Sequence, residues 1–97
     1  MTDSSSSRVI WSPRAIRDLA GIRAYIGQFA PLAARRFTGR LVATVESLTE
    51  HPNRGRPVGD GVRELVAVRP YLVLYEVRDQ MVHILHIKHG AQRPGSN

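Results

Sequence analysis

Residues 62–88 read VRELVAVRPYLVLYEVRDQMVHILHIK, and this stretch decides the fold. β-Branched and aromatic residues dominate three runs within it, at 62–68, 71–77 and 81–88. Runs of this composition favour strands. The gaps between them are short enough for antiparallel hairpins. The stretch therefore predicts three consecutive antiparallel strands.

A first amphipathic helix is predicted upstream of these strands. Ser12 is suited to accept a hydrogen bond as an N-cap, and Pro13 fits the first helical position, where its missing N–H costs nothing. Apolar residues then recur at helical spacing from Ile16 to Phe29. The pattern predicts a helix of about four turns.

A second helix follows at once. The residue before a proline is pushed out of the α region, so Pro31 ends the first helix and starts another. The apolar stripe of the second helix consists of Phe37, Leu41, Val45 and Leu48, and residues 51–53 stop it. A connection this tight predicts an antiparallel helical hairpin.

The order of elements predicts the fold class. Residues 8–11 have the composition of a short strand, and residues 52–61 have that of a loop, with three glycines and two prolines in ten positions. Strands clustered after a helical pair indicate an α+β fold. We expect the order β-α-α-β-β-β, with the hairpin packed on a mainly antiparallel four-stranded sheet.

Length and composition restrict the class of protein. With 97 residues we expect one domain at 8–94, flanked by tails at 1–7 and 95–97. The absence of cysteine excludes disulfides and thiolate metal sites. No signal peptide or membrane span is predicted, which favours a cytoplasmic location. The net charge is +6 and thirteen of the fourteen cationic side chains are Arg, which favours an anionic macromolecular partner over a merely basic surface.

The run at 71–77 is apolar on both alternating faces. A sheet with one solvated face should alternate more clearly between apolar and polar residues. The extra apolar residues are Leu72 and Leu74. Either a partner covers them, or this strand is central and crowded by loops.

Several stretches, in this order and at this spacing, resemble the RelE/ParE superfamily of bacterial toxins. They are residues 11–13 leading into the first helix, 63–65, 70–77 and 84–91. The resemblance covers residues 8 to about 94, and the closing segment at 89–93 is more similar to the ParE branch. It implies a toxin of a type II toxin–antitoxin system with a cognate antitoxin. The antitoxin would cover Leu72 and Leu74 by apolar contact and the arginines by acidic charge.

The resemblance leaves the target open. ParE-like members are associated with inhibition of DNA gyrase, and RelE-like members cut mRNA on the ribosome. Cleavage by attack of the 2′-hydroxyl needs a base, a cation for the phosphate and an acid. The residues that the resemblance offers are Arg63 and His89, with Glu64, Glu76, His83, His86 and Arg93 in reserve. The chain departs from the RelE pattern because it has no Lys in the 52–61 loop and no Tyr after Tyr75.

Three hypotheses follow: a gyrase-binding inhibitor, a ribonuclease and a non-toxic nucleic-acid-binding module. For target or nucleic-acid binding we single out Arg54, Arg56, Arg63 and Arg93, although a solvated, mobile loop is the slightly better interpretation for the first two. His83 and His86 differ in parity and should face opposite sides of their strand. Tyr71 and Tyr75 are expected in the core. No metal site and no cofactor is predicted, since no histidine pair has ligand spacing on a helix.

Overall fold

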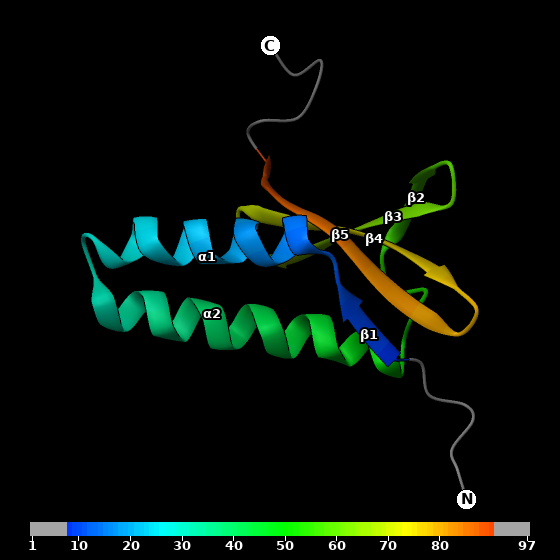
Figure 1. The fold of residues 1–97 in the computed structure, drawn as a ribbon, viewed down its shortest axis with the longest axis horizontal. Coiled ribbons are helices and arrows are strands. Elements are labelled where there is room, and N and C mark those ends of the chain that lie inside the picture. The colour runs from blue at the N-terminus through cyan, green and yellow to red at the C-terminus, as the bar shows by residue number, and fades with distance from the viewer. Residues whose placement is uncertain (1–7, 91–97) are drawn as a thin grey trace, which may run out of the picture.

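The computed structural model describes residues 8–90, which form two α-helices on one side of a five-stranded sheet (Figure 1). The predicted tails at 1–7 and 95–97, and Arg93, lie outside these residues. The elements are β1 Arg8–Trp11, α1 Pro13–Gly27, α2 Pro31–Glu46, the 3₁₀ turn η1 Ser47–Thr49, β2 Arg56–Gly59, β3 Val62–Val68, β4 Tyr71–Arg78 and β5 Met81–His89.

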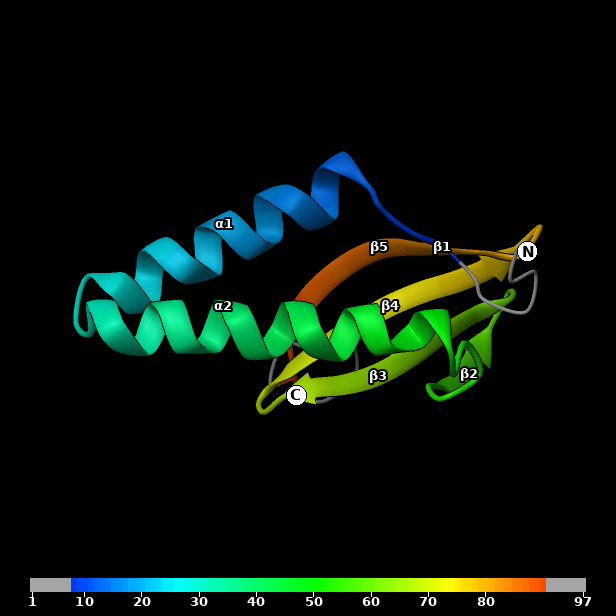
Figure 2. The ribbon, with the colours of Figure 1, turned by 90° about the horizontal axis from the view of Figure 1, so that it is seen from below.

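The sheet has the strand order β1-β5-β4-β3-β2. The strands β2 to β5 pair antiparallel, and β1 pairs parallel with β5. The helices run antiparallel, and the turn between them extends past the ends of the strands (Figures 1 and 2). The predicted α+β fold, with a helical hairpin on a mainly antiparallel sheet, is confirmed.

The sequence prediction missed one strand. Residues 56–59 form β2 at the edge of the sheet, where a four-stranded sheet with a loop at 52–61 was expected. Asp60 and Gly61 both have positive φ, 55° and 77°, which lets β2 fold back onto β3. The glycines and prolines therefore mark a hairpin with a short edge strand, which also accommodates Pro57.

Both helix starts follow the prediction. The Ser12 hydroxyl accepts a hydrogen bond from the Ala15 N–H at 3.0 Å, and Pro13 and Pro31 occupy first-turn positions. The second helix ends earlier than expected, at Glu46. A 3₁₀ turn, Ser47–Thr49, then carries the chain to the predicted stop.

The core lies between the helices and one face of the sheet. Its buried helical residues are Ala15, Phe37, Leu41 and Val45, with Leu48 from η1. Its buried strand residues are Leu65, Val73, Tyr75, Val82, Ile84 and Ile87. Phe37 also meets Tyr71 edge-to-face, with ring centroids 5.2 Å apart. The predicted core placement of Tyr75 is confirmed, and Tyr71 packs against the core from a half-buried position.

A β-bulge in β5 changes which side chains share a face. Leu74 is opposite His86 and Tyr75 is opposite Ile84, so Leu85 is an extra residue without a partner in β4. Glu76 is opposite His83. The two histidines therefore point to the same side of the sheet, and the parity-based expectation that they face opposite sides was wrong.

Candidate functional site

The loop at 52–55 is held by two side chains of the sheet. Tyr75 is fully buried, and its hydroxyl donates to the Pro52 carbonyl at 2.8 Å and accepts from the Gly55 N–H at 2.7 Å. Arg63 lies opposite Tyr75 on β3, and its Nη1 donates to the carbonyls of Gly55 at 2.6 Å and Asn53 at 3.2 Å. We call this set of contacts the loop clasp. It gives buried polar groups of the loop the partners that they need.

The loop clasp leaves no room for a side chain at residue 55. A Cβ on Gly55 would lie 2.8 Å from the Tyr75 ring and hydroxyl and 2.9 Å from the Glu64 carbonyl. Two of these atoms belong to a buried ring and the third to backbone. A glycine is therefore required where the loop crosses the sheet.

The other two arginines of this region also have internal partners. Arg54 Nη1 donates to the Ser47 hydroxyl at 2.9 Å. Arg56 donates through Nε and Nη2 to one oxygen of Glu64, at 3.2 and 2.9 Å. The Arg56 side chain is 68% exposed and that of Glu64 only 9%, so the pair presents mainly its cation to solvent. The structure thus gathers Arg54, Arg56 and Arg63 at one end of the sheet.

His89 lies at the other end of the sheet from Arg63. It pairs with Tyr71, whereas Arg63 pairs with Tyr75, and these two tyrosines are separated by about 13 Å along β4 at 3.3 Å per residue. Arg63 and His89 also flank β4 on opposite sides. The ring of His89 stacks edge-on against Tyr71, with centroids 5.3 Å apart. The structure does not bring the two candidate catalytic residues together.

The reserve residues do not form an alternative acid–base set around Arg63. Glu64 accepts from Arg56, and Glu76 accepts from Arg78 at 3.0 Å. His83 lies opposite Glu76, one row from the Arg63–Tyr75 pair but on the other face of the sheet. Arg93 lies outside the described residues.

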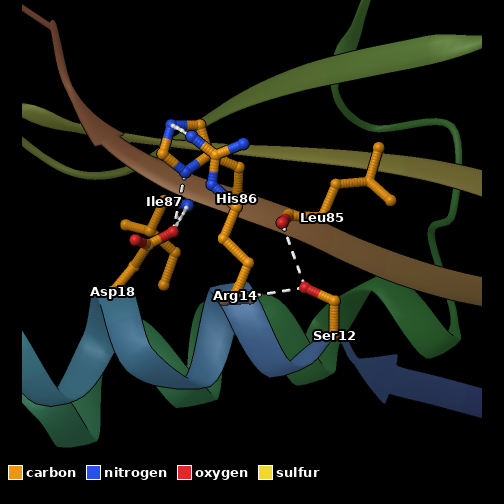
Figure 3. A network of polar contacts seen from close by, with 7 residues as sticks. Ser12, Arg14, Asp18, Leu85, His86 and Ile87 are labelled. Carbon is orange, nitrogen blue, oxygen red and sulfur yellow. Dashed lines mark hydrogen bonds and ion pairs between the residues drawn. The ribbon is translucent and has the colours of Figure 1, made fainter.

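A polar network that the sequence did not predict joins α1 to the edge of β5 (Figure 3). Asp18 Oδ2 lies 2.7 Å from His86 Nδ1 and accepts the Ile87 N–H at 3.0 Å. Arg14 Nη2 lies 3.4 Å from His86 Nε2. Strand β1 pairs with β5 only as far as Ile84, so Asp18 satisfies an edge group that β1 does not reach.

Ser12 extends this network toward β1. Besides capping α1, its hydroxyl donates to the Leu85 carbonyl at 3.0 Å, and its N–H donates to the Ile84 carbonyl at 2.9 Å. The carbonyl of Leu85, the bulge residue, thus receives its hydrogen bond from Ser12, the residue that caps α1. The two hydrogen bonds that Ser12 donates tie the start of α1 to β5.

The sheet face turned away from the helices carries Leu72 and Leu74. Leu72 is opposite Val66 and Lys88, and Leu74 is opposite Glu64 and His86. Leu72 is 7% exposed and belongs to no part of the main core, whereas Val66 is 53% exposed. This face is therefore mixed, with an apolar strip between charged and imidazole side chains.

The family model of the ParE toxin of the type II toxin–antitoxin system parDE matches residues 9–94. The chain belongs to the ParE toxin family. It is accordingly a toxin of a type II toxin–antitoxin system, and the resemblance to the RelE/ParE superfamily is confirmed.

Individual relatives carry names from both branches. Toxin RelE2 of Caulobacter vibrioides is 50% identical over 86 residues, which cover 89% of this chain and 98% of the relative. The structure of a chromosomal ParDE system from P. aeruginosa matches this ParE-family toxin with a TM-score of 0.80 and 27% identity, over 88% of this chain and 97% of that one. The toxin–antitoxin complex RelBE2 from Mycobacterium tuberculosis matches with a TM-score of 0.62 and 26% identity, over 87% and 98%.

Two further findings concern other site classes. Within residues 8–90 of the toxin, no three His, Cys, Asp or Glu side chains are grouped so that they could hold a metal ion. Neither helix in this part of the chain has the length and hydropathy that a membrane-spanning segment requires.

Proposed function

We propose that this toxin stops growth by binding DNA gyrase in the cytoplasm and that a cognate antitoxin neutralises it. The observation that carries this proposal is the position of Arg63. Its guanidinium is bonded to two carbonyls of its own chain and lies at the other end of the sheet from His89. Inhibition by binding needs an adhesive surface and no acid–base pair.

RNA cleavage would require a different arrangement of these residues. A base, a phosphate-binding cation and an acid must all reach one phosphodiester. Arg63 and His89 are separated by about 13 Å along β4 and stand on opposite neighbouring strands. This separation supports a binding mechanism over a catalytic one.

The target surface that we propose is the arginine-rich end of the sheet. Arg56 contributes the most exposed guanidinium there, and Arg54 and Arg63 position the loop beside it. We include Arg93 in this surface on the basis of its sequence position alone. An acidic protein surface or a nucleic acid held by gyrase would suit these cations.

The antitoxin surface that we propose is the sheet face with Leu72 and Leu74. Val66 adds the largest exposed apolar area on the neighbouring strand. With a net charge of +6, the toxin favours an acidic antitoxin. We expect affinity for the antitoxin to fall as salt is raised, and an affinity that is insensitive to salt would refute the electrostatic part.

A ribosome-dependent mRNA endonuclease is the second candidate. The name of the Caulobacter relative, RelE2, supports it. This candidate requires that His89→Ala abolish cleavage while the protein stays folded. Arg63→Ala should do the same, but it also removes the loop clasp, so His89 gives the cleaner test.

One experiment separates these functions. The toxin is expressed under tight control without its antitoxin, while growth, plasmid supercoiling and the integrity of translated mRNA are followed in the same cells. Arrested growth with altered supercoiling and intact transcripts is the result that we expect. Cut transcripts with normal supercoiling would refute gyrase binding, and unaffected growth with soluble protein would favour a non-toxic nucleic-acid-binding protein.

A further inference from the structure

Gly21 lies in the middle of α1, where glycine is unfavourable. Glycine in a helix interior is less stable than alanine because it loses more conformational freedom. Gly21 is exposed, and a Cβ added to it would meet no atom of the described chain within 4 Å. Its own fold therefore gives no packing reason for a glycine here, in contrast to Gly55.

Gly21 forms part of the wall of a cleft between α1 and the end of β5. The cleft has a volume of about 420 Å³, and Tyr25 and Tyr71 contribute aromatic rings to its lining. A helix surface without a Cβ allows another backbone to approach closely. The size of the cleft suits a few side chains of a peptide segment.

The charges that line this cleft are mostly positive. Arg17 and Lys88 provide two cations, and His86 and His89 provide imidazoles. The single carboxylate in the lining, Asp18, is already engaged by His86 and by the Ile87 N–H. Charge complementarity therefore favours an acidic segment that also carries apolar or aromatic side chains.

We propose that an acidic segment of the antitoxin docks in this cleft, with its backbone crossing α1 at Gly21. This inference rests on the proposed toxin–antitoxin function and adds a second contact surface to it. The cleft is continuous with the proposed antitoxin face of the sheet, because Lys88 and His86 are opposite Leu72 and Leu74. One antitoxin chain can therefore cover the sheet face and continue into the cleft.

The test compares two helix glycines. Gly21→Ala and Gly21→Leu are set against Gly39→Ala and Gly39→Leu, since Gly39 is also exposed in a helix interior with no atom within 4 Å of an added Cβ, but lies on α2 outside this cleft. Thermal unfolding reports the fold of each variant. Calorimetric titration with the purified cognate antitoxin reports antitoxin binding.

We expect substitution at either glycine to leave the toxin folded, but only substitution at Gly21 to weaken antitoxin binding. Both alanine variants should raise Tm by about 4–8 °C, because helix propensity improves. Gly21→Leu should weaken antitoxin binding at least about tenfold, while Gly39→Leu should leave it within about twofold.

Other results would overturn the inference in distinguishable ways. Normal antitoxin binding by folded Gly21→Leu would remove the cleft from the interface and leave the proposed function intact. The cleft is also removed from the antitoxin interface if Gly21→Leu abolishes toxicity, or abolishes binding of a single-stranded oligonucleotide, while binding of the antitoxin is unchanged. Failure of the wild-type toxin to bind the antitoxin would overturn both proposals.

Discussion

The hydroxyl of Tyr75 offers the sharpest test of the loop clasp. Tyr75→Phe keeps the ring in the core but removes both hydrogen bonds, to the Pro52 carbonyl and from the Gly55 N–H. Each bond is worth about 0.5–1 kcal/mol, and the buried Gly55 N–H left without a partner adds a desolvation cost of about 1 kcal/mol. We therefore expect a loss of about 2–3 kcal/mol in unfolding free energy.

The assay is equilibrium unfolding in urea together with thermal melting. For a domain of this size the loss corresponds to a fall in Tm of about 10–20 °C. Tyr25→Phe is the matched control. Tyr25 is 61% exposed, so loss of its hydroxyl should change the free energy of unfolding by less than about 0.5 kcal/mol. If the two variants are equally stable, the hydroxyl does not hold the loop and the reasoning about Arg63 loses its support.

Three further changes test other parts of the structure. Gly55→Ala places a Cβ 2.8 Å from Tyr75 and should destabilise by more than about 2 kcal/mol, so that a Tm equal to wild type would disprove the close contact. Asp18→Ala removes the acceptor at the edge of β5 and should cost about 1–3 kcal/mol in urea unfolding. Faster amide exchange at the end of β5 should accompany this loss. Arg56→Gln removes the exposed cation that pairs with the mostly buried Glu64 and should cost about 1–3 kcal/mol, and unchanged stability would show that this pair does not help to hold β2 on β3.

The sequence predicted the elements whose signals are local. The N-cap at Ser12, the two prolines that begin helices and the three apolar runs after residue 61 all lie within a few residues of the structure they specify. Strand β2 was missed because its glycines and prolines were weighed as loop composition. The Asp60-Gly61 pair between two short runs was the available signal, since it favours a two-residue hairpin turn.

The candidate site depends on contacts that local patterns do not encode. The bulge at Leu85 shifts the register of β5, so alternation alone placed His83 and His86 on opposite sides. The bond between Asp18 and His86 joins residues 68 positions apart. The resemblance singled out Arg63 as a phosphate-binding candidate, and that role stays a prediction. No sequence pattern indicated that the Arg63 guanidinium donates to the backbone carbonyls of Asn53 and Gly55, because these contacts depend on how the 52–55 loop folds.

The distribution of charge explains why an acidic partner suits the isolated toxin. On the sheet, Glu64 and Glu76 are each paired with an arginine. Residues 19–45 of the helical hairpin contain four arginines and no acidic residue. Their mutual repulsion is unfavourable in the free chain and is relieved when opposite charge is brought close. Binding of an acidic partner relieves this repulsion and therefore gains affinity. The long range of the attraction also speeds the approach of the partner before short-range contacts form.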